Sequence, residues 1–215
     1  MEIEYFGGNA IKIKEGGESI GFDLSGSGSD KKASAALKDV KAVFFTDDHR
    51  AKGGVPEGVH GFQMPGEYEI GPFSVRGLAV EPQGDVYGTK SSNVFLVDPG
   101  GDFGLVGIIA YAKPQLSSEA LDLLANARLL VVPVGGSGLS LEPEDAMKMV
   151  KELNAEFVLP VHFDDGKAKY DVPQAGYSEF AKLSGSEPEV FEGKLATKKL
   201  IGGVEGVKVV VITPA

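Results

Sequence analysis

The sequence predicts a single-domain protein of mixed α and β structure. Within residues 1–24, apolar residues alternate with polar or small ones, which is typical of strands. Further along, continuously apolar segments typical of buried strands are interspersed with segments whose apolar residues recur at helical spacing. The chain has 215 residues, 42% of them hydrophobic and 24% charged, so it can bury a substantial core. We therefore assign residues 1–215 to one domain.

Residues 1–24 are expected to form a β-meander. Its strands are indicated by three apolar pairs, which are Ile3 and Tyr5, Ile11 and Ile13, and Ile20 and Phe22. Pairs of glycines between these segments supply the turns. Residues 25–36 begin with alternating Ser and Gly and are expected to be a polar loop.

The central stretch, residues 41–52, joins an apolar segment to a cluster of ionisable residues. Val43 to Phe45 are expected to form a short buried strand, because Val and Phe suit a sheet that is covered on both faces. Residues 46–52 then lie at the carboxyl end of that strand. In open α/β sheets, ligands and catalytic groups gather at such ends.

The second half of the chain shows apolar strands and amphipathic helices. The expected strands are residues 93–98, 105–111, 129–136, 157–163 and 207–212. The expected helices are residues 116–124, a segment opening at 142–146, and 177–183. Ser117 or Ser118 can cap the first of these helices, and Pro143 suits the first turn of the second.

Composition narrows the classes of partner. A formal net charge of −10 and a pI near 4.8 disfavour nucleic acid and anionic membrane surfaces, which bind clustered Lys and Arg. The sequence contains no cysteine, so disulfides and thiolate chemistry are excluded. The acidic N-terminus does not resemble a signal peptide, and no apolar run reaches the ~18 residues of a membrane span. We expect a cytoplasmic protein without nucleic-acid or membrane partners.

Several segments resemble motifs of the metallo-β-lactamase superfamily. The most specific are Gly66–Gly71, Val132–Gly136, and Pro160–His162, which matches the family's Pro-x-His strand end. The resemblance covers the whole chain and implies an α+β fold, a four-layer αββα sandwich with its site between two similar halves. Among active branches, the chain is most similar to the L-ascorbate-6-phosphate lactonase-like hydrolases.

The family's metal-binding loop reads Thr-His-x-His-x-Asp-His, and the central stretch resembles it only in part. Thr46 is kept and His49 matches the second His. Asp47 stands at the first His position, Ala51 at the Asp position, and Lys52 at the last His position.

The family's remaining ligands are also mostly replaced. Glu81 or Pro82 stands where the resemblance implies a further His, and Tyr111 stands where it implies the Asp that bridges two metals. His162 is kept. Five of the seven aligned ligand positions have therefore changed, and an activated-water mechanism needs a dense set of imidazoles and carboxylates.

Lys52 is the most informative replacement, because a protonated ammonium repels a metal cation. It could instead supply the missing positive charge by pairing with Asp47, Asp48 or Asp165; alternatively, it is an exposed lysine without a role. His49 and His162 could share a binding role or simply satisfy hydrogen bonds among buried loops. The predicted binding residues are Asp47, His49, Lys52, Tyr111 and His162.

Three functions remain open at this stage. The preferred one, because most ligands are lost, is a non-catalytic binding or scaffold protein for a small molecule or a protein, with no cofactor. The second is a hydrolase of a lactone or phosphorylated small molecule, which uses one zinc, iron or manganese ion. Its ligands would be Asp47, His49, Glu81 and His162. The third is a metal-free enzyme in which Lys52, Tyr111 and His162 act as acid and base groups.

Overall fold

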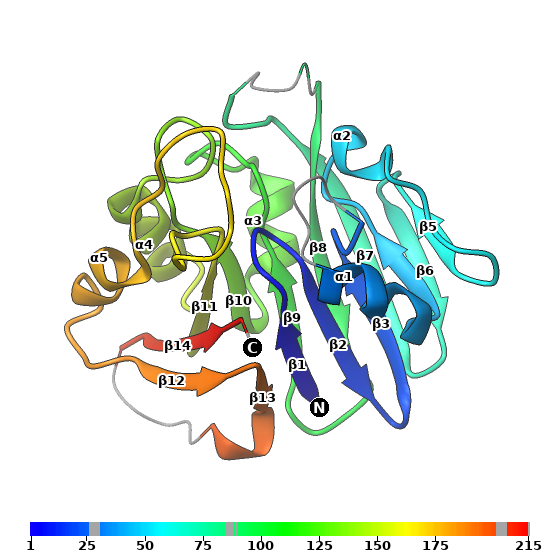
Figure 1. Cartoon of the computed structure of the whole chain (residues 1–215). Helices are drawn as coiled ribbons and strands as arrows, with labels where there is room; N and C mark the ends of the chain where they lie inside the picture. The colour runs from blue at the N-terminus through cyan, green and yellow to red at the C-terminus, as the bar shows by residue number, and fades with distance from the viewer. Residues whose placement is uncertain (26–30, 85–87, 89, 201–205, 215) are drawn as a thin grey trace.

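The computed structural model describes residues 1–25, 31–84, 88, 90–200 and 206–214, which form two mixed β-sheets flanked by helices (Figure 1). The six-stranded sheet has the order β13-β1-β2-β3-β4-β5. Its strands are β1 (Glu2–Tyr5), β2 (Ile11–Glu15), β3 (Glu18–Phe22), β4 (Ala42–Phe44), β5 (His60–Phe62) and β13 (Lys194–Ala196). The first three strands pair antiparallel, which confirms the predicted meander.

The eight-stranded sheet has the order β12-β14-β11-β10-β9-β8-β7-β6. Its strands are β6 (Gly66–Ile70), β7 (Phe73–Val80), β8 (Ser92–Asp98), β9 (Leu105–Ile108), β10 (Ala127–Pro133), β11 (Phe157–Val161), β12 (Glu189–Glu192) and β14 (Lys208–Thr213). Strands β6 to β9 pair antiparallel, whereas β9, β10, β11, β14 and β12 pair parallel. Strands β10 and β11 are almost wholly buried, as their continuous apolar runs predict.

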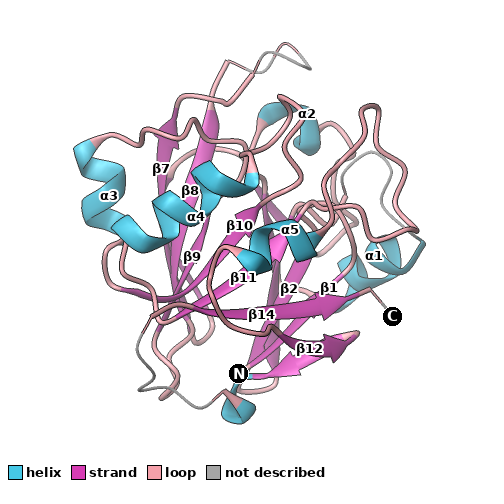
Figure 2. Cartoon of the chain, turned by 90° about the vertical axis from the view of Figure 1, so that its left-hand side faces the viewer, coloured by secondary structure: helices cyan, strands magenta, loops and turns pink. Residues whose placement is uncertain are grey.

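The helices lie on the outer faces of the two sheets. They are α1 (Lys31–Ala36), α2 (Asp48–Ala51), α3 (Ser118–Leu124), α4 (Pro143–Glu152) and α5 (Tyr177–Lys182), with short 3-10 turns at Leu37–Asp39 and Thr197–Lys199. Figure 2 shows α3, α4 and α5 in front of the eight-stranded sheet, and Figure 1 shows α1 and α2 beside the six-stranded sheet. The α+β fold with four αββα layers is therefore confirmed. None of the helices in the described residues is long and apolar enough to cross a membrane.

Two hydrophobic clusters hold these layers together. The larger fills the space between the sheets and continues under α3, α4 and α5. The smaller lies between the six-stranded sheet and α1 with its following turn. Strand β4 and the residue after it contribute side chains to both clusters, because successive side chains of a strand point to opposite faces of the sheet. Phe44 packs between the sheets against Phe22 and Phe95, whereas Val43 and Phe45 pack in the outer cluster.

The predicted polar loop at residues 25–36 is wrong for its second half. Lys31–Ala36 form α1, and Ala33 and Ala36 are buried in the outer cluster. Residues 26–30 of that prediction lie outside the described part of the chain. Residues 31–36 are mostly Lys and Ala, which favour a helix, and burial of two alanines against the sheet stabilises a helix as short as this one.

Of the two predicted caps of α3, Ser117 and Ser118, the structure has Ser117 in that role. Its hydroxyl accepts a hydrogen bond from the Ala120 N–H at 3.3 Å. Ser117→Ala should lower the free energy of unfolding by about 1 kcal/mol, because one N–H at the helix start loses its acceptor. Urea denaturation measures this change, and Ser118→Ala is the control because Ser118 is exposed within the helix. Equal effects of the two substitutions would contradict the capping role.

The fold brings several strand ends to a common edge. Strands β3 and β4 are parallel neighbours, so Asp23 and Thr46, which follow them, lie side by side. In the other sheet β9 and β11 both run parallel to β10, and their carboxyl ends lead to Tyr111 and His162. An isolated bridge between Asp47 and Ser92 joins the loop after β4 to the start of β8.

Candidate functional site: an arginine-centred polar cluster

Asp23 and Thr46 form the base of the site. Both are buried, and Asp23 has a left-handed backbone with φ of 50°. The Asp23 carboxylate accepts hydrogen bonds from the Thr46 N–H, at 2.9 Å, and from the Thr46 hydroxyl. Burial raises the pKa of Asp23 to about 6, although the Arg50 charge and the Thr46 hydrogen bonds oppose that shift. A carboxyl group with such a pKa titrates just below neutral pH.

Asp47 starts the short helix α2 and directs Arg50 into the site. The Asp47 carboxylate accepts a hydrogen bond from the Arg50 N–H at 2.8 Å, which is the arrangement of a helix N-cap. The Arg50 side chain therefore turns back over its own cap. Its Nε lies 3.7 Å from Asp47 Oδ2 and 3.9 Å from Asp23 Oδ2, and the side chain is 12% exposed.

Tyr111 closes the other side of the Arg50 guanidinium. The Arg50 Nη2 donates a hydrogen bond to the Tyr111 hydroxyl, and the Arg50 Cζ lies 5.0 Å from the centroid of the Tyr111 ring. Burial on its own would lower the pKa of Arg50, but Tyr111, Asp23 and Asp47 together raise it above its ordinary value. Arg50 is therefore a permanent cation held by two carboxylates and an aromatic ring.

His162 completes the cluster from the end of β11. Its ring packs edge-on against Tyr111, with 5.4 Å between ring centroids, and lies 4.7 Å from the ring centroid of Tyr170. Its Nδ1 lies 3.1 Å from Gln174 Oε1, which can only accept, so Nδ1 carries the proton. Burial, reinforced by the Arg50 charge, lowers the pKa of His162 to about 3. The imidazole is therefore neutral at physiological pH.

The backbone around His162 is held as firmly as its ring. Its φ of 51° lies in the left-handed region, which is uncommon for a residue other than glycine. Its N–H lies 2.8 Å from the Gly8 carbonyl and 3.2 Å from the Tyr5 hydroxyl. The Tyr5 hydroxyl in turn donates to the same Gly8 carbonyl at 3.1 Å. The turn between β1 and β2 thus fixes the position of His162.

The structure brings together three of the five predicted binding residues. Asp47 and Tyr111 contact Arg50 directly, and His162 contacts Tyr111. His49 lies next to Arg50 on α2 and is half-buried. Lys52 is exposed after the end of α2 and has no ion pair with the described residues.

The cation of the cluster is therefore Arg50 and not Lys52, which corrects the hypothesis that Lys52 pairs with Asp47, Asp48 or Asp165. In the family pattern Arg50 occupies an unassigned position, so the resemblance gave it no role. A usable signal was present nonetheless. Asp47 is a good N-cap residue, and the i,i+3 spacing within a helix brings Arg50 back over Asp47. Nothing local could indicate Gln174, because its contact with His162 depends on how the loop after β11 folds.

Glu81 is a further candidate ligand of the mononuclear hydrolase, and its ion-pair partner is a residue outside this cluster. It is exposed and pairs with Lys113, whose hydrogen bond and charge lower the pKa of Glu81. Across the described ranges, no group of three or more His, Cys, Asp or Glu side chains converges so as to hold a metal ion.

The donor set around Arg50 does not fit a zinc ion. Zinc normally takes at least three protein ligands, and its charge would meet the guanidinium that already pairs with Asp23 and Asp47. The protonated Nδ1 of His162 is engaged with Gln174, which leaves Nε2 alone as a potential ligand atom. The residues of this cluster therefore do not form a ligand set for a metal ion.

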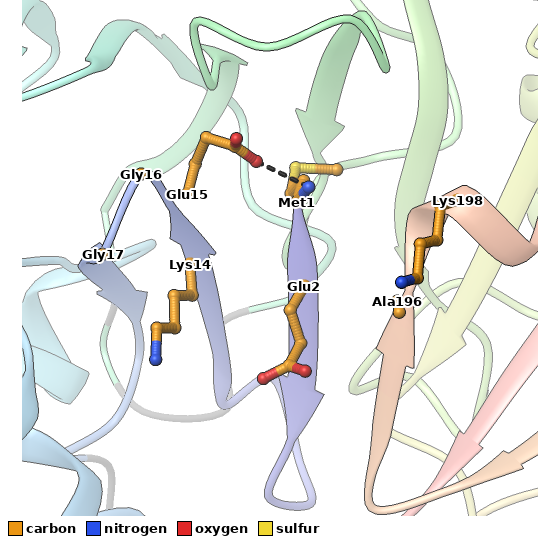
Figure 3. A pocket seen from close by; sticks show the side chains of 8 residues that line it. All are labelled: Met1, Glu2, Lys14, Glu15, Gly16, Gly17, Ala196 and Lys198. Carbon is orange, nitrogen blue, oxygen red and sulfur yellow. Dashed lines mark ion pairs between the residues drawn. The ribbon is translucent and has the colours of Figure 1, made fainter.

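Two cavities lined by described residues lie away from the Arg50 cluster. The first, of about 340 Å³, lies at the end of the six-stranded sheet where Lys14, Glu15 and Lys198 line it (Figure 3). There the Met1 amino group pairs with Glu15 at 2.6 Å. The second, of about 500 Å³, lies between β1, α1 and the turn that joins β12 to β13. Neither is lined by any of the predicted site residues.

Comparison with known proteins supports the assignment of the fold. The family model described as a beta-lactamase superfamily domain matches residues 2–162, from the first strand to His162. Among curated proteins, no sequence matches this chain.

Solved structures resemble the chain over nearly its whole length. A protein proposed to be a zinc-dependent hydrolase of the metallo-β-lactamase superfamily, from Thermotoga maritima, superposes with a TM-score of 0.69 at 19% identity and covers 98% of this chain and 97% of its own. The metallo-β-lactamase fold protein YhfI from Bacillus subtilis gives 0.62 at 13% identity, with 99% and 96% covered. Isothiocyanate hydrolase from Delia radicum gut bacteria gives 0.62 at 14% identity, with 86% and 91% covered.

At these identities the structural likeness shows the fold, and the family model shows the membership. The match extends through the strand ends that carry Asp23, Arg50, Tyr111 and His162. From the sequence match and the αββα architecture together, we conclude that this chain belongs to the metallo-β-lactamase superfamily.

Proposed function

We propose that this chain is a metal-independent binding protein built on the metallo-β-lactamase fold. The observation that carries the proposal is the buried Arg50 guanidinium, which lies between Asp23 and Asp47 under the Tyr111 ring. Arg50 supplies the positive charge that the resemblance assigns to metal ions in active relatives. The site then has a structural role, and binding takes place on a scaffold that carries out no hydrolysis.

The chemistry of the guanidinium supports this role. Arginine stays protonated at every physiological pH. The N–H donors of its planar guanidinium can pair with carboxylates, and the flat face of the guanidinium can stack on an aromatic ring. A second cation in the same partly dry cluster would be repelled at a distance of a few ångströms. Arg50 is shared by Asp47 and by Asp23, whose carboxylate is mostly ionised at pH 7 with a pKa of about 6 and also accepts two hydrogen bonds from Thr46.

The proposed partner is a small molecule or a protein. The net charge of −10 disfavours nucleic acid as a partner, and the lack of cysteine is in keeping with a cytoplasmic location. A hydrolytic role would need an activated water, for which the residues around Arg50 offer no metal-ligand set within the described structure.

The metal content of the protein tests the proposal. Protein purified without chelator and without a metal-affinity step should contain far less than one zinc, iron or manganese ion per chain by mass spectrometry. Addition of zinc followed by desalting should leave the melting temperature unchanged, because no ligand set stabilises the folded state by binding the ion.

The opposite outcome favours the mononuclear hydrolase. About one metal ion per chain, lost in His49→Ala together with hydrolysis of a lactone or phosphorylated substrate, would overturn metal independence. Lys52→Ala is the matched control, because Lys52 follows the same helix but is exposed. It should leave metal content and melting temperature as they are in the parent.

A further inference from the structure

The larger of the two cavities described above has the dimensions of a small-molecule site. Its volume of about 500 Å³ falls within the roughly 300–1,000 Å³ that is typical of ligand pockets. It lies on the outer side of the six-stranded sheet, between α1 and the β12–β13 turn. The residues that line it are Glu4, Tyr5, Phe6, Lys12, Ala35, Ala36, Asp39, Glu192, Gly193, Lys194 and Pro214.

Part of this lining is apolar and offers a surface for a hydrocarbon or aromatic group. Phe6 is half-buried and packs against the outer hydrophobic cluster. Ala35 and Ala36 bring the side of α1 to the cavity, and Pro214 closes another side. Burying an apolar group of a ligand against these side chains removes it from water and so favours binding.

Lys12 supplies the polar anchor of the cavity. Its side chain is only 11% exposed, and its ammonium lies 3.1 Å from Glu4 and 5.9 Å from the centroid of the Phe6 ring. An ammonium has three N–H donors, and Glu4 is its ion-pair partner within the described residues. The remaining donors are available to an acceptor that enters the cavity.

The charged side chains of the cavity differ in how strongly they can interact with a ligand, because they differ in burial. Asp39, Glu192 and Lys194 are exposed, so water and salt screen them. Lys12 is largely withdrawn from water, so a hydrogen bond to its ammonium is stronger than one at the rim.

We propose that this cavity binds a small amphipathic carboxylate, with the carboxylate on Lys12 and the apolar part against Phe6, Ala35 and Pro214. The proposal goes beyond metal independence, because the residues that line this cavity include none of those that form the Arg50 cluster. Either inference can fail without the other.

Octanoate is a suitable probe, and octylammonium is its counterpart with the same tail and the opposite charge. In an NMR titration, octanoate should shift the backbone amide signals of Phe6, Ala35 and Gly193 saturably. Octylammonium should bind at least tenfold more weakly, because its head group meets Lys12 with a like charge.

Two variants locate the site. Ala35→Phe adds a ring at an exposed position that lines the cavity and should weaken octanoate binding by tenfold or more. The double variant Lys12→Met with Glu4→Gln removes the ion pair as a unit, so that no half-buried charge is left alone. It should weaken binding roughly tenfold, the factor expected of one charge-assisted hydrogen bond.

Lys14→Met is the matched control, since Lys14 lies two residues along β2 and lines the other cavity. It should bind octanoate as the parent does. Far-ultraviolet circular dichroism and melting curves establish that each variant is folded before titration. The proposal is overturned if octanoate shifts no amide near Phe6, if Ala35→Phe binds it unchanged, or if octylammonium binds more tightly.

Discussion

Arg50→Met should lower the free energy of unfolding by about 3 kcal/mol at pH 7.5, because it removes one partner of a buried ion pair and leaves the other uncompensated. Asp47 is 3% exposed and Asp23 is 1% exposed, so neither carboxylate can recover its lost interaction from water. The Tyr111 hydroxyl loses its guanidinium donor in the same step. Urea denaturation with an unchanged slope measures the loss.

A second substitution separates charge from packing. Arg50→Met with Asp47→Asn should recover part of the loss, because the asparagine removes one of the two uncompensated charges and still accepts from the N–H of residue 50 as a cap. Lys52→Met is the control on the same loop and should change stability by less than about 0.5 kcal/mol, since its side chain is exposed. If Arg50→Met lowers the free energy of unfolding no more than Lys52→Met does, Arg50 is not the cation that stabilises the cluster.

The second large effect is the dependence of stability on pH, in which Asp23 and His162 act in opposite directions. The pKa of His162 falls from 6.5 to about 3 on folding, so its contribution is fully present above pH 6.5 and is lost as the pH falls from there toward 3. The pKa of Asp23 rises from 3.8 to about 6, so its contribution is fully present below pH 3.8 and is lost as the pH rises through 6. Between about pH 6 and 4 the two slopes offset each other.

Asp23→Asn removes one of these opposing contributions and exposes the other. Relative to the parent at the same pH, the variant should lose roughly 3 kcal/mol of stability between pH 6.5 and 4, at about 1.4 kcal/mol per pH unit, because the parent gains that amount when its folded Asp23 takes up a proton that the unfolded Asp23 does not. Urea denaturation at several pH values measures the difference between the two proteins.

His162→Asn provides the matched control, because asparagine tolerates the left-handed backbone at this position. This variant should gain stability relative to the parent as the pH falls from 6.5 to 4, since only the Asp23 contribution remains. Parallel pH profiles for the parent and both variants would show that neither residue changes its pKa on folding.

The sequence predicted most secondary-structure elements because their patterns are local. Alternation identified β1, β2 and β3, and continuous apolar runs identified β10 and β11, since period and composition follow from which faces a strand buries. Helix α1 was missed because the Ser and Gly residues before it suggested a loop. Its Lys and Ala residues favour a helix, but a helix this short needs packing to be stable, and Ala33 and Ala36 share the outer cluster with Leu24 and Val43.

The sequence also placed Asp47, Tyr111 and His162 in one site, but only through the resemblance to a family. No local pattern links residues so far apart, whereas parallel strands that end at one edge of each sheet bring them together. The same resemblance singled out Lys52, because Lys52 stands at an aligned ligand position. It assigned no role to Arg50, which stands between two ligand positions.

The sequence by itself determined the α+β class from residue type and spacing along the chain, and its motifs indicated the layered architecture and the family through their resemblance to the superfamily. Only the tertiary structure decided which cation the site contains. Because Asp47 caps α2, Arg50 turns into the cluster and Lys52 turns toward solvent. The partners of Arg50 come from distant segments, since Asp23 follows β3 and Tyr111 follows β9. The physical reason is that a buried charge is stable only where several distant segments supply its partners together.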